Sequence, residues 1–124
     1  MILGIGVDAV SIERASRLGN AFTKRWFSPS ENDELAALSD AALEIRAQFI
    51  ASRFAVKEAY AKARGTGFCQ NVVPSEISVS KDGNGKPCVV LSGRTAEGTQ
   101  GQRVNVSITH EAPLAIAFVT IEEA

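Results

Sequence analysis

Two acidic residues and a lysine have the types and spacing of a site that handles phosphate groups. Glu58 is the only acid within residues 46–65, which carry five basic residues. Lys62 follows Glu58 by four positions, so the two side chains share one face of a helix. Asp8 interrupts an apolar segment at the start of the chain. If the fold brings them together, the two carboxylates would hold Mg²⁺ with room left for water and phosphate oxygens.

These residues also have simpler interpretations. A Glu58–Lys62 pair at this spacing is in most helices a solvated ion pair worth about 0.3–0.5 kcal/mol. Asp8 is also suited to capping a helix that starts near Ser11, because Asp is a preferred capping residue. Both interpretations remain open at the level of sequence.

A second basic pair favours the phosphate interpretation. Arg53 and Lys57 are again four apart, and the segment 65–67 (Gly-Thr-Gly) follows the same helix. Cationic side chains and free backbone N–H groups together suit a phosphate. The lone histidine, His110, is expected at the end of a strand, where a hydrogen-bonded structural role and a role in chemistry are both open.

The long helix is the element that must position most of these groups. Residues 41–64 contain no Gly or Pro and are rich in Ala, and Gly65 follows where a left-handed helix end is needed. Apolar residues 1–10 predict a buried strand ending near Asp8 or Ala9. Ser11 then caps a short helix on which Arg14 and Arg17 share a face.

The rest of the chain predicts one further short helix and a set of strands. A short helix is expected to start at Ser30, with acidic residues in its first turn. Turn residues at 82–85 and at 111–113 each separate two β-rich segments. The expected strands are 77–81, 87–91, 103–109 and 114–121, with a short helix from Arg94. The prediction is a single α+β domain over 1–124, with a mostly antiparallel sheet packed on the long helix.

Composition excludes several classes of protein. The 124 residues carry 13 basic and 14 acidic side chains, so no bulk positive field favours nucleic acid. Residues 1–10 lack a basic leader and contain Asp8, which argues against a signal peptide or a membrane span. Cys69 and Cys88 have no CxxC neighbour and are interpreted as inert, reduced thiols of a cytoplasmic protein.

Three segments resemble the holo-acyl-carrier-protein synthase family of 4′-phosphopantetheinyl transferases. They are residues 4–8 (GIGVD), residues 53–62 (RFAVKEAYAK) and residues 107–110 (SITH). The family's pattern is an aromatic residue, a small residue, any residue, Lys-Glu, a small residue, two further residues and a final Lys. It is met without departure from Phe54 to Lys62. The turn at 84–87 (NGKP) is also similar, and residues 19–43 match least.

The resemblance implies a reaction and a metal. Coenzyme A and an apo acyl carrier protein give the holo carrier and adenosine 3′,5′-bisphosphate, when the carrier's serine hydroxyl attacks the β-phosphate. The acids at Asp8 and Glu58 are implied to bind Mg²⁺, with Mn²⁺ as the open alternative. For the base that takes the serine proton, metal-bound water or Glu58 is favoured over His110, because neither needs an unusual pKa shift near neutral pH.

The resemblance also implies roles for other residues and a set of partners. Lys62 is expected to assist the leaving group, and His110 to contact phosphate or assist proton removal. The expected contacts of the adenosine bisphosphate end are Arg53, Gly65, Thr66, Asn84, Gly85, Lys86, Pro87 and His110. Arg14 and Arg17 are expected to dock the acidic carrier of fatty acid biosynthesis, although a solvated helix face explains them as well. A homotrimer that shares its active sites between subunits is implied. Neither a membrane nor a nucleic acid is expected as a partner.

The competing function is a non-catalytic module that binds coenzyme A or a nucleotide. Binding alone needs only positive charge, whereas two acids beside a pyrophosphate repel it unless a metal intervenes. Asp8 and Glu58 together therefore favour catalysis. A structural trimeric protein, the third possibility, leaves these acids and Lys62 without a purpose.

Overall fold

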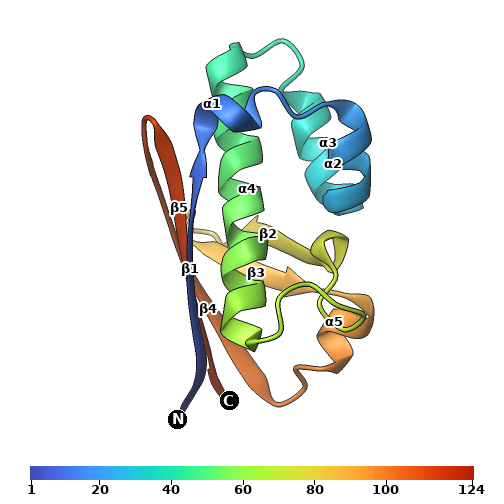
Figure 1. Cartoon of the computed structure of the whole chain (residues 1–124), viewed down its shortest axis with the longest axis vertical. Helices are drawn as coiled ribbons and strands as arrows, with labels where there is room; N and C mark the ends of the chain where they lie inside the picture. The colour runs from blue at the N-terminus through green and yellow to red at the C-terminus, as the bar shows by residue number, and fades with distance from the viewer.

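The computed structural model describes residues 1–124 and places one long helix against three antiparallel strands (Figure 1). The helix is α4 (Leu43–Arg64), and the strands run in the order β1 (Ile2–Ser11), β5 (Leu114–Glu123) and β4 (Gln102–Glu111). The predicted long helix is thus confirmed, although it starts two residues later than expected. It ends as predicted, since Gly65 has a φ of 80°, which an L side chain rarely adopts.

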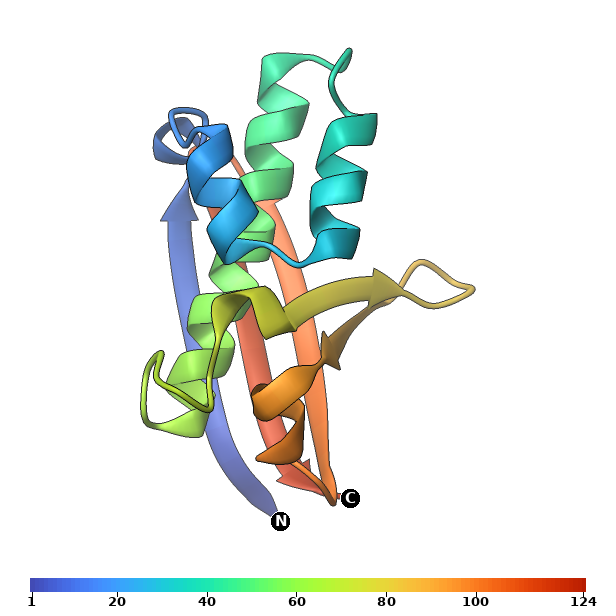
Figure 2. The ribbon, with the colours of Figure 1, turned by 90° about the vertical axis from the view of Figure 1, so that its right-hand side faces the viewer.

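A smaller two-stranded sheet packs on the long helix from another side (Figure 2). It consists of β2 (Ile77–Lys81) and β3 (Pro87–Leu91), preceded by the 3₁₀ turn η1 (Pro74–Glu76) and followed by α5 (Gly93–Glu97). The α+β prediction is confirmed, with two antiparallel sheets where one was expected. None of the helices has both the length and the apolar run that crossing a bilayer requires.

Three short helices lie beside the N-terminal part of α4 (Figure 1). They are α1 (Ile12–Ala15), α2 (Asn20–Trp26) and α3 (Pro29–Ala37). The Oγ of Ser11 accepts a hydrogen bond from the N–H of Arg14, as the predicted cap requires. Two expectations were wrong: α3 is capped by Ser28 and starts before Ser30, and α2 was not predicted at all. Its seven residues are too few for periodicity to be decisive.

The expectation that the first strand is buried was also wrong. It is an edge strand that runs on to Ser11, and its partner is β5. One face packs on α4, whereas the opposite face is bare (Figure 1). On that bare face Ile5 is 61% exposed, Val7 54% and its cross-strand neighbour Phe118 41%. Exposed apolar side chains gathered in this way are typical of an interaction surface.

Candidate functional site

Asp8, Glu58 and Lys62 are brought together in one cavity. The first cavity has a volume of about 480 Å³ and lies between β1, α1, α2 and α4. Arg14 lines it beside the three residues, and the remaining wall is mostly apolar, with Phe22 and Phe54 among its members. The helix contributes Phe54, Glu58 and Lys62 because residues four apart share one face. The structure thus places Glu58 and Lys62 on one helix face, as the i, i+4 spacing predicts.

Two glycines position Asp8. A Cβ on Gly6 would collide with the carbonyl oxygen of Ala59, and one on Gly4 with that of Ala63. The strand can therefore approach the helix backbone closely, which places Asp8 opposite the turn that carries Lys62. The sequence pattern Gly-x-Gly-x-Asp carried this signal, but the role of its glycines was not predicted. Any larger residue at Gly6 would separate the two halves of the site.

The charges in the first cavity are tightly coupled. The Nζ of Lys62 donates to the Asp8 Oδ1 at 3.0 Å and to the Val7 carbonyl oxygen at 3.0 Å. Burial raises the pKa of the Glu58 carboxyl, the negative charge of Asp8 raises it further, and Lys62 works in the opposite direction. The ionised form of Glu58 is therefore disfavoured while no cation other than Lys62 is close. Asp8 does not cap the following helix, because Ser11 does.

This donor set fits a Mg²⁺ ion. The ionised form of Glu58, which burial and the charge of Asp8 disfavour, would be stabilised by a divalent cation between the two carboxylates. The chain contains no group of three or more His, Cys, Asp or Glu side chains that is close enough to hold a metal. Mg²⁺ is commonly bound by one or two carboxylates, with water and phosphate oxygens at the other positions. Asp8 and Glu58 are thus suitable ligands for an ion that shares its coordination with a phosphorylated substrate.

A second cavity holds another part of the predicted set. It has a volume of about 230 Å³ and lies between α4, the β2–β3 hairpin and β4. Its lining includes Arg53, Lys81, Pro87 and His110 and no acidic residue. Three side chains that are or can become cationic therefore face one small space, which is suited to a phosphate group.

Arg53 is held firmly in this second cavity. Its guanidinium lies 4.5 Å from the centroid of the Phe49 ring, and one nitrogen donates to the Ser52 Oγ at 3.2 Å. Glu34 approaches it at 3.8 Å. Burial lowers the pKa of Arg53, and the charge of Glu34 opposes that shift. The side chain is only 8% exposed, so it is pre-ordered toward whatever enters the cavity.

Other predicted residues lie outside both cavities. Thr66, Asn84, Gly85 and Lys86 are exposed in turns, and Gly65 ends α4 next to Thr66. Arg14 and Arg17 do not share a helix face as expected, because α1 ends at Ala15. Arg17 is instead paired with Glu13 at 2.8 Å in an exposed ion pair.

Lys57 corrects the expectation that it joins Arg53 at a phosphate. Its side chain is fully buried, and its Nζ is 2.6 Å from the Oε1 of Glu31. It also donates to the carbonyl oxygens of Pro74, at 2.9 Å, and Ile77. The i, i+4 spacing does not reveal which of two cations faces the interior. The sequence did carry a signal for Glu31, since Ser28 and Glu31 have the spacing of a capping box.

Several residues of the two cavities were not predicted. Lys81 lies at the end of β2 and faces the second cavity, with Gln48 and Ser52 from α4 beside it. In the first cavity the missed residues include the apolar Leu18 and Phe22. Apolar residues are usually core residues, so nothing in the sequence distinguished these two.

Comparison with known proteins identifies the class to which this fold and site belong. A sequence model of the 4′-phosphopantetheinyl transferase superfamily matches residues 4–119. The match covers nearly the whole chain, and the chain belongs to this superfamily.

Within the superfamily, the relatives are holo-[acyl-carrier-protein] synthases. The enzyme of that name from Geobacillus sp. (strain WCH70) is 42% identical, over 98% of each chain. The crystal structure of the synthase from Neisseria meningitidis superposes with a TM-score of 0.88 at 35% identity, over 99% of this chain and 100% of that one. The Bacillus anthracis synthase, whose crystal structure is a complex with CoA (3′,5′-ADP), gives 0.85 at 33% identity, over 100% and 99%.

Proposed function

We propose that this protein transfers the 4′-phosphopantetheine group of coenzyme A to a serine of an apo acyl carrier protein. The products are the holo carrier and adenosine 3′,5′-bisphosphate. The observation that carries the proposal is the meeting of Asp8, Glu58 and Lys62 in one cavity of a chain that belongs to this superfamily. The domain comprises residues 1–124.

The chain's own residues suit the steps of this transfer. Lys62 lies where it would donate to a phosphate oxygen and so neutralise charge as the leaving group departs. The Glu58 carboxylate, ionised once a divalent cation offsets the charge of Asp8, or a water molecule beside it would accept the serine proton. Mg²⁺ held by Asp8 and Glu58 would supply positive charge to the pyrophosphate oxygens. The apolar wall that includes Phe22 and Phe54 would exclude water from the attacked phosphorus.

We assign the adenosine bisphosphate end of coenzyme A to the second cavity. Arg53, Lys81 and His110 would pair there with the phosphate groups that remain on the nucleotide. Gly65, Thr66 and the 84–87 turn remain the predicted further contacts of this end of the ligand. With His110 in the second cavity, its proposed role is phosphate binding.

A homotrimer would join the two cavities. Within one chain they are separate and share no lining residue. Assembly through the bare sheet face, which carries Ile5, Val7 and Phe118, would bury exposed apolar surface. It would also let the second cavity of one copy complete the first cavity of the next.

The proposed setting is fatty acid biosynthesis in the cytoplasm, with an acidic carrier protein as partner. Both cysteines are free thiols, which suits a reducing compartment. Arg14 lines the first cavity and Arg17 is exposed three residues further along the chain, so an acidic carrier that presents its serine to Asp8 and Glu58 would meet both.

The test is intact mass spectrometry of an apo acyl carrier protein after incubation with this protein, coenzyme A and Mg²⁺. A gain of one phosphopantetheine group that is lost in a parallel sample with EDTA is expected. If several apo carriers gain no mass while coenzyme A still binds, the protein is the non-catalytic binding module. A gain that persists in EDTA would contradict the metal assignment alone.

Charge reversal at the docking arginines is expected to act on one substrate only. Arg14→Glu with Arg17→Glu should raise the KM for the carrier about tenfold, because complementary charge steers acidic partners to a basic face. The KM for coenzyme A should not change. Arg103→Glu, at an exposed arginine of β4, is the matched control. If both KM values rise equally, or neither does, carrier docking does not involve these residues.

A further inference from the structure

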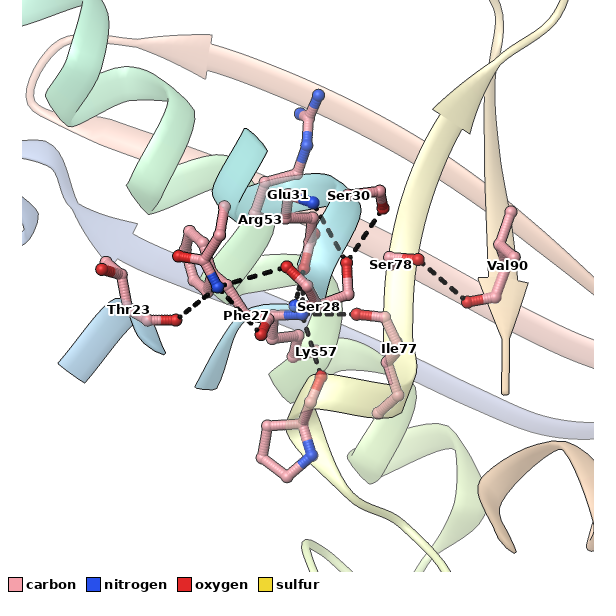
Figure 3. Close-up of polar contacts among 12 residues, drawn as sticks. Thr23, Phe27, Ser28, Ser30, Glu31, Arg53, Lys57, Ile77, Ser78 and Val90 are labelled. Carbon is pink, nitrogen blue, oxygen red and sulfur yellow. Dashed lines mark hydrogen bonds and ion pairs between the residues drawn. The ribbon is translucent and has the colours of Figure 1, made fainter. Parts of the chain in front are cut away.

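Lys57 makes a set of contacts that the proposed reaction does not use. Its ammonium group is fully buried between α3, η1 and the start of β2 (Figure 3). It pairs with Glu31, and donates to the carbonyl oxygens of Pro74 and Ile77. Burial lowers the pKa of this lysine, and the charge of Glu31 opposes that shift. An apolar side chain at position 57 would fill the same space without the free-energy cost of burying a charge. Packing alone therefore does not explain why a lysine is buried here.

On one side the network reaches the wall of the first cavity. Glu31 forms a capping box with Ser28 at the start of α3. The next residue, Asn32, donates through its Nδ2 to the carbonyl oxygens of Thr23, Phe27 and Ser28. Thr23 follows Phe22, whose side chain lines the first cavity. Lys57 is therefore linked to α3 through Glu31, and α3 is linked to α2 through Asn32.

On the other side the network reaches the second cavity. Pro74 and Ile77 lie at the point where the chain enters the β2–β3 hairpin, and Lys81 and Pro87 of that hairpin line the second cavity. No backbone hydrogen bond joins β2 or β3 to the three-stranded sheet. The hairpin's position against α4 therefore depends on side-chain packing and on the contacts of Lys57.

We infer that Lys57 is a positioning residue that fixes the β2–β3 hairpin, and with it the second cavity, relative to the helix that carries Glu58. The two residues are adjacent on α4, so the backbone that presents Glu58 to the first cavity also anchors the hairpin. This inference rests on the proposed transferase function, since it assigns the second cavity to coenzyme A.

The test removes the contacts of Lys57 without leaving a buried charge. The variant Glu31→Gln with Lys57→Met retains an acceptor for the capping box and removes both charges. It should fold, because replacing both partners of a buried pair is far less harmful than removing one. Its KM for coenzyme A should rise about tenfold while the KM for the carrier changes little, since misplacement of one part of a site weakens the ligand bound there.

Two control variants separate positioning from general stability. Glu31→Gln alone leaves the buried Lys57 without its counter-charge, so its unfolding temperature should fall. It keeps Lys57 and the two carbonyl acceptors, so its KM for coenzyme A should match the unmodified protein. Val56→Ala opens a cavity in the apolar core to which Val56 belongs, and should lower the unfolding temperature without changing either KM. If the double variant has the unmodified KM for coenzyme A, Lys57 only neutralises Glu31 and the inference is wrong.

Hydrogen exchange gives a readout that needs no turnover. Amides of residues 77–91 should exchange about tenfold faster in the double variant than in Val56→Ala, because the hairpin opens locally. Equal exchange in the two variants would overturn the inference, whether or not the protein transfers phosphopantetheine. If the Gln/Met pair does not fold, Glu31→Leu with Lys57→Met fills the same space with apolar groups and allows the same measurements.

Discussion

Glu58→Gln is expected to abolish transfer while leaving the fold intact. Gln matches the size of Glu but removes the negative charge that we assign to metal binding, and loss of several kcal/mol of transition-state stabilisation slows turnover by about a thousandfold. The measurement is the rate at which an apo carrier gains mass in the presence of coenzyme A and Mg²⁺.

The same variant should not be less stable than the unmodified protein. The pKa of the Glu58 carboxyl is raised in the folded chain, first by burial and then by Asp8. A raised pKa means that ionisation near neutral pH costs folding free energy, so removing the charge removes that cost. The unfolding temperature without metal should therefore stay level or rise. Lowered activity with a lowered unfolding temperature would instead indicate damage to the fold.

Glu44→Gln is the matched control for this prediction. Glu44 lies in the first turn of the same helix and lines neither cavity of the proposed site. Its variant should retain full activity. A well-folded Glu58→Gln protein with turnover within about tenfold of the unmodified rate would contradict the metal assignment, because loss of a required metal ligand should slow turnover much more than that.

The features that could be predicted from the sequence are those in which neighbouring residues determine the secondary structure and the direction of a side chain. Residues 43–64 form a helix because Ala and long side chains favour one over an uninterrupted run, and Gly65 permits the left-handed end. Glu58 and Lys62 share a cavity because they are one turn apart on that helix. Such features depend on a few neighbouring residues, so they can be derived without knowledge of the tertiary packing.

The features that were missed depend on packing between distant segments. Lys57 and Arg53 have the same local spacing, but Lys57 is buried because Glu31, which is 26 residues away, reaches it in the core. The first strand is apolar, yet it is exposed on one face because no further element of the chain covers the three-stranded sheet. Periodicity shows which side chains share a face of a helix or strand, but it does not show which of those faces another segment covers.

The division of the predicted site into two cavities has the same origin. Arg53 and His110 come together because β4 and α4 meet on the side of the helix away from Asp8. No pattern along the chain distinguishes a site within one chain from a site between two copies. An experiment that mixes variants can make this distinction.

Two inactive variants are expected to restore each other's activity when mixed. One carries Glu58→Gln in the first cavity, and the other carries Arg53→Gln with His110→Ala in the second. If each site combines the first cavity of one copy with the second cavity of its neighbour, co-expressed chains form mixed trimers in which some sites are fully intact. Random mixing at equal amounts should give about a quarter of the unmodified specific activity, since each half of a site is intact with even odds.

The control mixture pairs two lesions in the same cavity. Glu58→Gln mixed with Lys62→Met leaves no first cavity intact, so activity should not return. Phe118→Asp, added to both partners of the active mixture, should also prevent recovery by placing a charge on the bare sheet face. If Arg53 and Glu58 instead serve one site within a single chain, every mixture stays inactive, because no chain carries both halves unaltered.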